Sequence, residues 1–229
     1  MLITLDPALP PLPQWEDSPR FSFDAQGGVT FDHSLYRVQS DWSRRHVFLH
    51  ATAHLPRYNL VYLIRALFAI MLVERGGLLL HGAGLVRKGQ AYLFLGPSGT
   101  GKTTVARLSH ESGLAEILND DLVALMPEGD RWIAYATPFH NPTQAPFAPR
   151  PHSAPLRGVY KLVQAPHVAA NPLPLGQALA ALSAAVVVVM TDERRVPVLL
   201  ERLALLQVAH PVVELRFTRS TCFWNVVAS

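Results

Sequence analysis

The sequence predicts an α/β fold with a mixed sheet, and three observations lead to this prediction. Short apolar segments typical of strands alternate with longer helical patterns along most of the chain. A turn signal at 87–90 lies between two apolar segments and predicts an antiparallel hairpin. The second strand of that hairpin, 91–95, runs into a glycine-rich loop, and a helical pattern follows at 103–112. Strand, glycine loop and helix in this order are typical of α/β proteins.

The composition fits a globular chain with one main domain. The 229 residues are 49% hydrophobic and 16% charged, which is enough apolar material for a sizeable core. Lys and Arg total 20 against 17 for Asp and Glu, without a basic stripe, so we expect no nucleic-acid partner. The single cysteine, Cys222, excludes an internal disulfide and a cysteine-based zinc site. We expect no membrane span and no secretory signal, hence a cytoplasmic protein.

The first 75 residues are predicted to form an N-terminal α/β extension packed on the core. Five of the 19 prolines fall within the first 20 residues, which indicates an extended arm. The Gly76-Gly77 pair would end the last helix of this extension. The elements expected are two strands and a well-buried helix, at 21–23, 28–31 and 59–73.

The remaining residues, 76–229, are predicted to form the core domain. Helices are expected at 103–112, 175–185 and 196–209. Strands are expected at 78–80, 84–86, 91–95, 115–118, 122–126, 132–136, 159–163, 186–190, 212–217 and 223–227. Nine prolines between Pro138 and Pro174 predict a long irregular segment, because each proline lacks an N–H and fixes its own φ. This segment is either a lid over a substrate or a disordered insertion.

The glycine-rich loop satisfies the phosphate-loop pattern G-x-x-x-x-G-K-[ST]. Its glycines allow successive backbone N–H groups to surround phosphates, and the following helix adds a positive N-terminus. Lys102 would reach the β- and γ-phosphates, and the Thr103 hydroxyl would ligate Mg²⁺. The alternative is a chance glycine-rich turn. We expect ATP and Mg²⁺ as cofactors, with a nucleotide site made of Gly96, Pro97, Ser98, Gly99, Thr100, Gly101, Lys102, Thr103 and Thr104.

The hairpin places a histidine near this loop. A tight turn at Lys88-Gly89 would set Val86 opposite Ala91, so that opposed residue numbers sum to 177. In that register His81 falls opposite Gly96, at the mouth of the loop. The alternative is a structural histidine with its own hydrogen-bond partners.

An acidic pair follows the strand expected after the first core helix. Asp120 and Asp121 come directly after an apolar segment, and one helix, a turn and a short strand would bring them back beside the loop. One carboxylate could assist Mg²⁺ and the other could accept a proton from an attacking hydroxyl. The alternative is an Asx-type turn between two strands. Guanine-reading and transporter signatures are absent from the sequence, which favours phosphoryl transfer to a hydroxyl over a switch or a motor.

These strings together resemble the HPr kinase/phosphorylase family, and most closely its small HPr kinase-related members. The resemblance rests on Leu80 to Val86, the phosphate loop and Asn119 to Val123, with weaker echoes at 136–139, 154–160 and 223–227. It implies a P-loop kinase fold of the HPr kinase C-terminal and phosphoenolpyruvate carboxykinase-like type. Some members are encoded beside ribosomally made peptides, such as lasso peptides, and phosphorylate a serine on them.

The resemblance also implies roles for single residues. Asp120 becomes the general base, Asp121 a magnesium ligand and His81 an active-site histidine near the phosphates. Arg157 matches an arginine that would steady the transferring phosphoryl group, or else is a surface residue. The bifunctional enzymes carry Glu where this chain has Thr104, so a reverse phosphorylase reaction is not expected. We treat Arg150, Arg216 and Arg219 as surface residues.

The prediction is therefore an ATP- and Mg²⁺-dependent kinase that phosphorylates a hydroxyl, foremost Ser, on a peptide or small protein such as a ribosomally made precursor. Two alternatives stay open. One is a kinase for a small metabolite. The other is a nucleotide-binding accessory module of a peptide-modification pathway without transfer chemistry of its own. Hexamers occur in the family that the sequence resembles, so a homo-oligomer is an open expectation.

Overall fold

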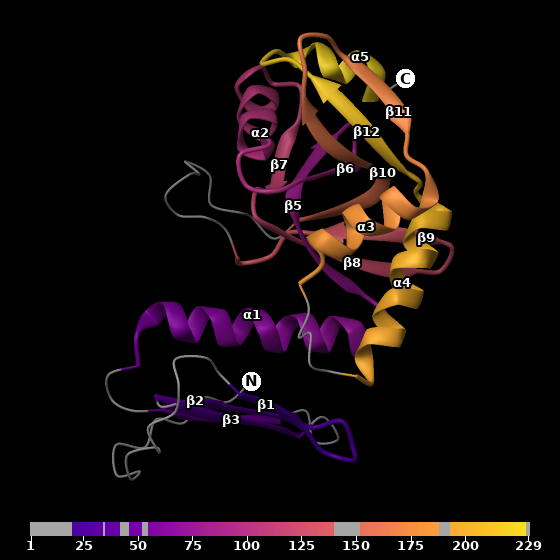
Figure 1. Ribbon diagram of the computed structural model, residues 1–229. Coiled ribbons are helices and arrows are strands. Elements are labelled where there is room, and N and C mark those ends of the chain that lie inside the picture. Colours follow the sequence, from indigo (N-terminus) through magenta and orange to yellow (C-terminus); the bar gives the residue numbers. More distant parts are fainter. Residues whose placement is uncertain are drawn as a thin grey trace. The chain divides into compact units, whose positions relative to one another are not determined.

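The computed structural model describes residues 20–33, 35–41, 46–51, 55–139, 152–187 and 193–227. The chain divides into two compact units, Met1–Ala66 with Val189–Arg194 and Leu67–Val188 with Arg195–Ser229. The division falls within helix α1 (Arg57–Glu74), ahead of the boundary expected after residue 75. Most of the expected arm and residues 140–151 of the proline-rich segment lie outside the described residues. Figure 1 shows the elements of each unit.

The first unit contains a four-stranded antiparallel sheet in the order β1-β2-β3-β4. Its strands are β1 (Arg20–Phe23), β2 (Val29–His33), β3 (Tyr36–Asp41) and β4 (His46–Ala51). Burial alternates along β2 and β3, so one face of the sheet is buried, with Phe31 and Tyr36 among its largest side chains. Neither β3 nor β4 was predicted from the sequence, and every second residue of β3 is polar or charged.

The second unit is built on a mixed sheet of eight strands in the order β11-β12-β10-β6-β5-β8-β9, with β7 paired to β5 (Figure 1). The strands are β5 (Leu78–Arg87), β6 (Gln90–Leu95), β7 (Glu116–Asn119), β8 (Leu122–Glu128), β9 (Arg131–Tyr135), β10 (Ser153–Gln164), β11 (Ala169–Pro172) and β12 (Val212–Phe217). The helices are α2 (Lys102–Glu111), α3 (Leu175–Ala185), α4 (Arg195–Ala209), α5 (Trp224–Val227) and the short η1 (Thr221–Phe223). An α/β fold with a mixed sheet is therefore confirmed.

The hairpin β5–β6 has the predicted register, because Val86 pairs with Ala91 and Gly82 with Leu95. Its turn residues Lys88 and Gly89 both have positive φ, as a two-residue turn of this hand requires. β5 is one continuous strand rather than the two predicted. Its first half pairs with β8, and its second half pairs with both β6 and β7.

The pairings also close into a ring. The first residues of β10 pair with β9, while its later residues pair with β6 and then β12. Strands β5, β6, β10, β9 and β8 are therefore hydrogen-bonded in a continuous circuit. β10 reaches β9 only because it begins at Ser153 and includes Pro155, which corrects the expectation that no long element runs through the proline-rich segment.

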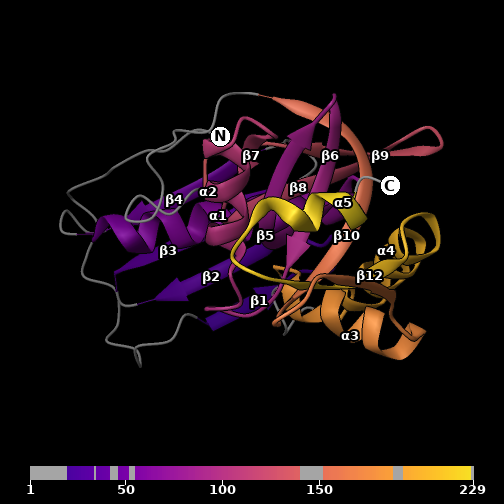
Figure 2. The same ribbon diagram turned by 90° about the horizontal axis from the view of Figure 1, so that it is seen from above.

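Residues of β6 face two hydrophobic cores in alternation. Leu93 and Leu95 belong to the core that contains residues of α3 and α4. Tyr92 and Phe94 belong to an aromatic core that contains residues of α2 and α5. The two helix pairs therefore cover opposite faces of this strand, an arrangement that can be followed in Figure 2.

The chain end after β12 is helical, so the strand predicted at 223–227 is wrong. Phe223 and Trp224 are buried in the aromatic core beside Phe94, and the Trp224 Nε1 donates to Ser109 Oγ at 2.9 Å. The Tyr160 hydroxyl donates to the Val227 carbonyl at 3.0 Å. These tertiary contacts outweigh the β-propensity of the segment. Of the strand predicted at 186–190, Val186 forms an isolated bridge with Leu80, and 188–190 lie outside the described residues.

The direction of the strands positions the site. β6, β10 and β12 are parallel, and β7 runs in the same direction because both β6 and β7 are antiparallel to β5. The carboxyl ends of these four strands therefore meet at one edge of the sheet, where ligands bind in open α/β sheets. No helix in the described part of the chain combines the length and apolar character needed to cross a bilayer.

Candidate functional site

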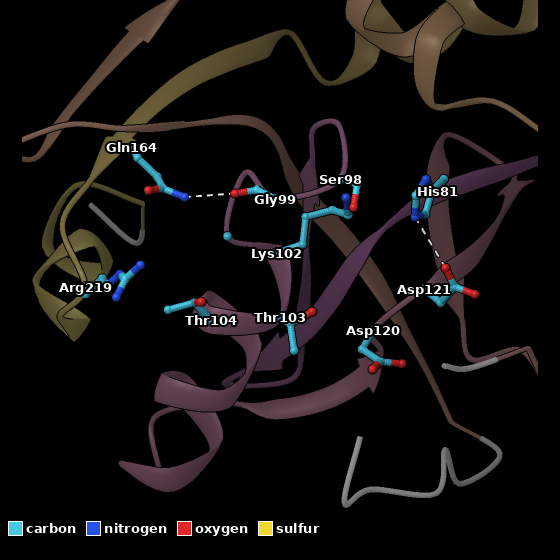
Figure 3. A pocket seen from close by; sticks show the side chains of 11 residues that line it. His81, Ser98, Gly99, Lys102, Thr103, Thr104, Asp120, Asp121, Gln164 and Arg219 are labelled. Carbon is cyan, nitrogen blue, oxygen red and sulfur yellow. Dashed lines mark hydrogen bonds and ion pairs between the residues drawn. The ribbon is translucent and has the colours of Figure 1, made fainter. Parts of the chain in front are cut away.

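A cavity of about 430 Å³ lies at this edge of the second unit (Figure 3). It collects residues at or just after the carboxyl ends of β6, β7, β10 and β12, together with His81 from β5. The lining residues are His81, Ser98, Gly99, Gly101, Lys102, Thr103, Thr104, Asp120, Asp121, Gln164 and Arg219.

The glycine-rich loop connects β6 to α2 in a conformation that requires glycine at two positions. Gly96 has φ 153° and Gly101 has φ 105°. A Cβ on Gly96 would lie 2.5 Å from Thr100 Oγ1, and one on Gly101 would lie 2.5 Å from Phe217 Cζ. The Thr100 hydroxyl in turn donates to the Pro97 carbonyl at 2.8 Å. Gly96, Pro97 and Thr100 thus shape the loop, although they do not line the cavity.

Lys102 is the first residue of α2, and its side chain turns back over the loop. Its Nζ donates to the carbonyls of Gly96 at 2.7 Å and Pro97 at 3.0 Å. The residue is 92% buried, since only 8% of its surface is exposed. Burial lowers the pKa of Lys102, and the negative charge of Asp121 opposes that effect. An ammonium with two of its three donors fixed on the loop has a third N–H available for an anionic ligand.

His81 and the acidic pair lie on the other side of Lys102 and Thr103 from Gln164 and Arg219 (Figure 3). The His81 Nε2 is 3.3 Å from Asp121 Oδ1. His81 pairs with Leu122 across β5 and β8, and the Gly82 N–H donates to the Asp121 carbonyl at 2.9 Å. The acidic turn, residues 119–122, joins β7 to β8 along one edge of β5, and this places it beside the histidine.

The acidic turn is held by a buried side chain, Asn119, which is 1% exposed. Its Oδ1 accepts from the N–H groups of Asp121 and Leu122, at 2.8 and 3.0 Å. Its Nδ2 donates to the carbonyl and the hydroxyl of Thr137, at 2.9 and 3.2 Å. The Thr137 hydroxyl donates to the Leu122 carbonyl at 2.7 Å. The Asx-type turn considered as an alternative is therefore present, and it positions the two carboxylates at the cavity.

The structure does not bring Arg157 to the cavity. It lies at a bulge in β10 beside the first residues of β6, Ala91 and Tyr92. The loop begins five residues further along β6, about 16 Å away at the rise of a strand. Because β10 is parallel to β6, it is the carboxyl end of β10, at Gln164, that reaches the loop, where Gln164 Nε2 donates to the Gly99 carbonyl at 2.9 Å.

Gln164 was not predicted as a site residue, and Arg219 was predicted to be a surface residue, which agrees with its exposure. Both line the cavity. The signal that could have identified them is their place after strands parallel to β6, since Gln164 ends β10 and Arg219 follows β12. Strand order and direction, which the sequence pattern alone does not determine, decide that place.

The donor set fits a magnesium ion better than a transition metal. Among the described residues, no group of three or more His, Cys, Asp or Glu side chains forms a metal site. The cavity instead offers the Thr103 hydroxyl and the carboxylates of Asp120 and Asp121. Mg²⁺ prefers such a set, because it binds one or two carboxylates together with phosphate oxygens and water.

Comparisons with known proteins place the chain in a family. A solved structure of the Hpr(Ser) kinase/phosphatase from Coxiella burnetii aligns with 66% of this chain and 91% of its own, at 11% identity and a TM-score of 0.35. A search of curated proteins found no match. The family model described as "SynChlorMet cassette protein ScmC" matches residues 56–229, which include every residue that lines the cavity. This match covers more than half of the chain, and the chain therefore belongs to the ScmC family of SynChlorMet cassette proteins.

Proposed function

We propose that this protein is a phosphotransferase that moves the γ-phosphoryl group of ATP to a hydroxyl, foremost that of a serine on a peptide or small protein. One observation carries the proposal. A glycine-rich loop with a buried lysine at a helix N-terminus shares one cavity with two carboxylates and a histidine. The first group of residues suits phosphates, and the second suits a metal ion and an acceptor hydroxyl.

In this proposal the loop and α2 hold the triphosphate. The backbone N–H groups from Gly99 to Thr103 face phosphate oxygens, and Lys102 uses its third N–H on the β- and γ-phosphates. The Thr103 hydroxyl and Asp121 hold Mg²⁺, which when bound neutralises charge on the phosphate oxygens. His81 fixes the orientation of the Asp121 carboxylate through their 3.3 Å contact.

Asp120 acts on the acceptor. It takes the proton as the acceptor O–H bond breaks, a new bond forms between that oxygen and the γ-phosphorus, and the bond to the β-phosphate oxygen breaks to release ADP. Lys102 stabilises the negative charge that develops on the leaving oxygen. Arg157 has no part in this scheme because it lies away from the cavity.

The direct test is transfer of labelled phosphate from ATP with Mg²⁺ to a panel of serine-containing peptides and small alcohols. We expect a labelled peptide with the native protein, and at least a hundredfold slower labelling with Asp120→Asn, whose ATP affinity should stay within about threefold. Asp130→Asn serves as the matched control, because the Asp130 side chain is 96% exposed at the turn between β8 and β9.

The description of the family as cassette proteins favours a second candidate function. In that reading the chain is a nucleotide-binding accessory module of a modification pathway. It predicts ATP binding by the native protein and by Asp120→Asn alike, with no labelled acceptor. That outcome would overturn the kinase proposal. If only a small alcohol were labelled, the acceptor would be a small metabolite and not a peptide.

A further inference from the structure

One cationic side chain in the cavity has no part in the proposed transfer. Arg219 lines the cavity, and within the part of the chain that the structure describes no acidic side chain is paired with it. The neighbouring Arg216, by contrast, pairs with Glu214 at 3.0 Å on β12. An arginine without a carboxylate partner at the wall of a cavity is suited to an anionic ligand.

The backbone around Arg219 forms a compact turn at the carboxyl end of β12. The Ser220 N–H donates to the Thr218 carbonyl at 2.7 Å, and the two hydroxyls lie 2.9 Å apart. The Ser220 hydroxyl also accepts from the Cys222 N–H at the start of η1. These bonds hold Arg219 at the tip of the turn, next to the parallel strand end that carries Gln164.

The position of Arg219 in the cavity indicates the orientation in which a nucleotide would bind. Figure 3 shows Arg219 and Gln164 on one side of the loop, with Thr104 between them and Thr103, and Asp120, Asp121 and His81 on the other side. The metal ion, the γ-phosphate and the acceptor belong with the carboxylates. The α-phosphate and the nucleoside must then extend toward Thr104 and Arg219.

We infer that Arg219 binds the α-phosphate of the nucleotide, with Gln164 fixing the loop at Gly99, so that this end of the cavity is the nucleoside side. The inference rests on the proposed function, since it assumes that a nucleotide occupies the cavity. It assigns Arg219 to binding of ATP and of ADP alike and separates it from the transfer step.

The experiment is calorimetric titration of the full chain with Mg·ATP and with Mg·ADP. Arg219→Gln should weaken the binding of both nucleotides by a similar factor, about tenfold for a charge-assisted contact at an open site. Arg219→Lys should lose less affinity for both nucleotides, because lysine keeps the positive charge but lacks the bidentate guanidinium. Arg216→Gln is the matched control and should bind both nucleotides as the native protein does. Thermal unfolding of each variant checks that it is folded.

The outcomes separate this inference from the proposed function. If the native protein binds ATP and ADP but Arg219→Gln binds both equally well, the inference alone is wrong. If Arg219→Gln loses affinity for ATP but not for ADP, Arg219 belongs to the γ-phosphate and the direction of the nucleotide is reversed. If the native protein binds neither nucleotide, the proposed function fails and the inference fails with it.

Discussion

The imidazole of His81 and the carboxylate of Asp121 are neighbours because the turn that carries Asp121 joins β7 to β8 along one edge of β5, between the pairs Gly84–Asn119 and His81–Leu122. In the proposed function, the histidine is a positioning group for the magnesium ligand Asp121. Asp121→Asn should raise the Mg²⁺ concentration needed for half-maximal transfer at least tenfold, because the metal loses an anionic ligand. His81→Leu should raise it by a smaller factor of at least about three, and His81→Gln should restore part of the loss.

The measurement is transfer rate against Mg²⁺ concentration at saturating ATP. Exposed His167→Gln is the control and should follow the native curve. A His81→Leu variant with unchanged magnesium dependence but a slower maximal rate would place His81 on the reacting groups instead.

The buried Asn119 should be a large contributor to the stability of the acidic turn. Asn119→Ala removes the side-chain acceptor of two backbone N–H groups and a donor to the Thr137 carbonyl, so we expect the free energy of unfolding to fall by about 2–3 kcal/mol. Thr137→Val should cost about 1–2 kcal/mol, and the double variant less than the sum, because the two side chains share a hydrogen bond.

Urea denaturation checks these values. The exposed Asn171 on β11 offers the matched substitution, and Asn171→Ala should change the free energy of unfolding by less than about 0.5 kcal/mol. Additive effects of the Asn119 and Thr137 changes would contradict the shared network.

The glycine-rich loop should tolerate a methyl group at one glycine and not at another. Gly99 and Gly101 both have positive φ, so alanine costs about 1 kcal/mol of backbone strain at either position. A Cβ on Gly99 meets no atom within 4 Å, whereas one on Gly101 would lie 2.5 Å from Phe217 Cζ. Gly101→Ala should therefore destabilise by about 1–3 kcal/mol more than Gly99→Ala, and Phe217→Leu should recover part of the difference. Thermal and urea unfolding measure both effects, and equal losses at the two glycines would show that the aromatic contact is irrelevant.

The first unit should lose stability at alkaline pH through one tyrosine. Burial, and to a smaller extent Tyr62, raises the pKa of Tyr36 to about 12. In the unfolded chain the Tyr36 hydroxyl releases its proton near pH 10. The contribution of Tyr36 to the free energy of unfolding is therefore complete below pH 10 and is lost as the pH rises through 12. Between pH 10 and 12, ionisation of Tyr36 should lower the free energy of unfolding by about 1.4 kcal/mol per pH unit.

Urea denaturation between pH 9 and 12, followed by a spectroscopic signal of the first unit, tests this. Tyr36→Phe should flatten the alkaline decline, and Tyr58→Phe, at a position that is 73% exposed, should keep the native slope. A decline that is identical in Tyr36→Phe would exclude Tyr36 as its source.

Local signals in the sequence were sufficient to predict the hairpin and the loop. The Lys88-Gly89 turn sets the register of β5 and β6 by itself, and the position of His81 follows from that register. The helix at 175–185 and the strand at 212–217 have the predicted bounds, because their apolar patterns match their burial.

Tertiary context decided the rest. Trp224 and Val227 form a helix through contacts with Ser109 and Tyr160, residues far away in the sequence. Arg157 and Arg219 look alike as isolated arginines beside strands. Only the parallel order of β6, β10 and β12 places one at the far end of the sheet and the other at the cavity.

The circuit of strands β5, β6, β10, β9 and β8 also affects how copies of this unit meet. A strand with neighbours on both sides has no row of open N–H and C=O groups on which a second chain could extend the sheet. Within the described part of the second unit, β7 and β11 are the strands with a neighbour on one side alone; each is four residues long, and Pro172 at the end of β11 has no N–H to donate. The strand that carries the phosphate loop is thereby protected from edge-to-edge association even when many copies are crowded together.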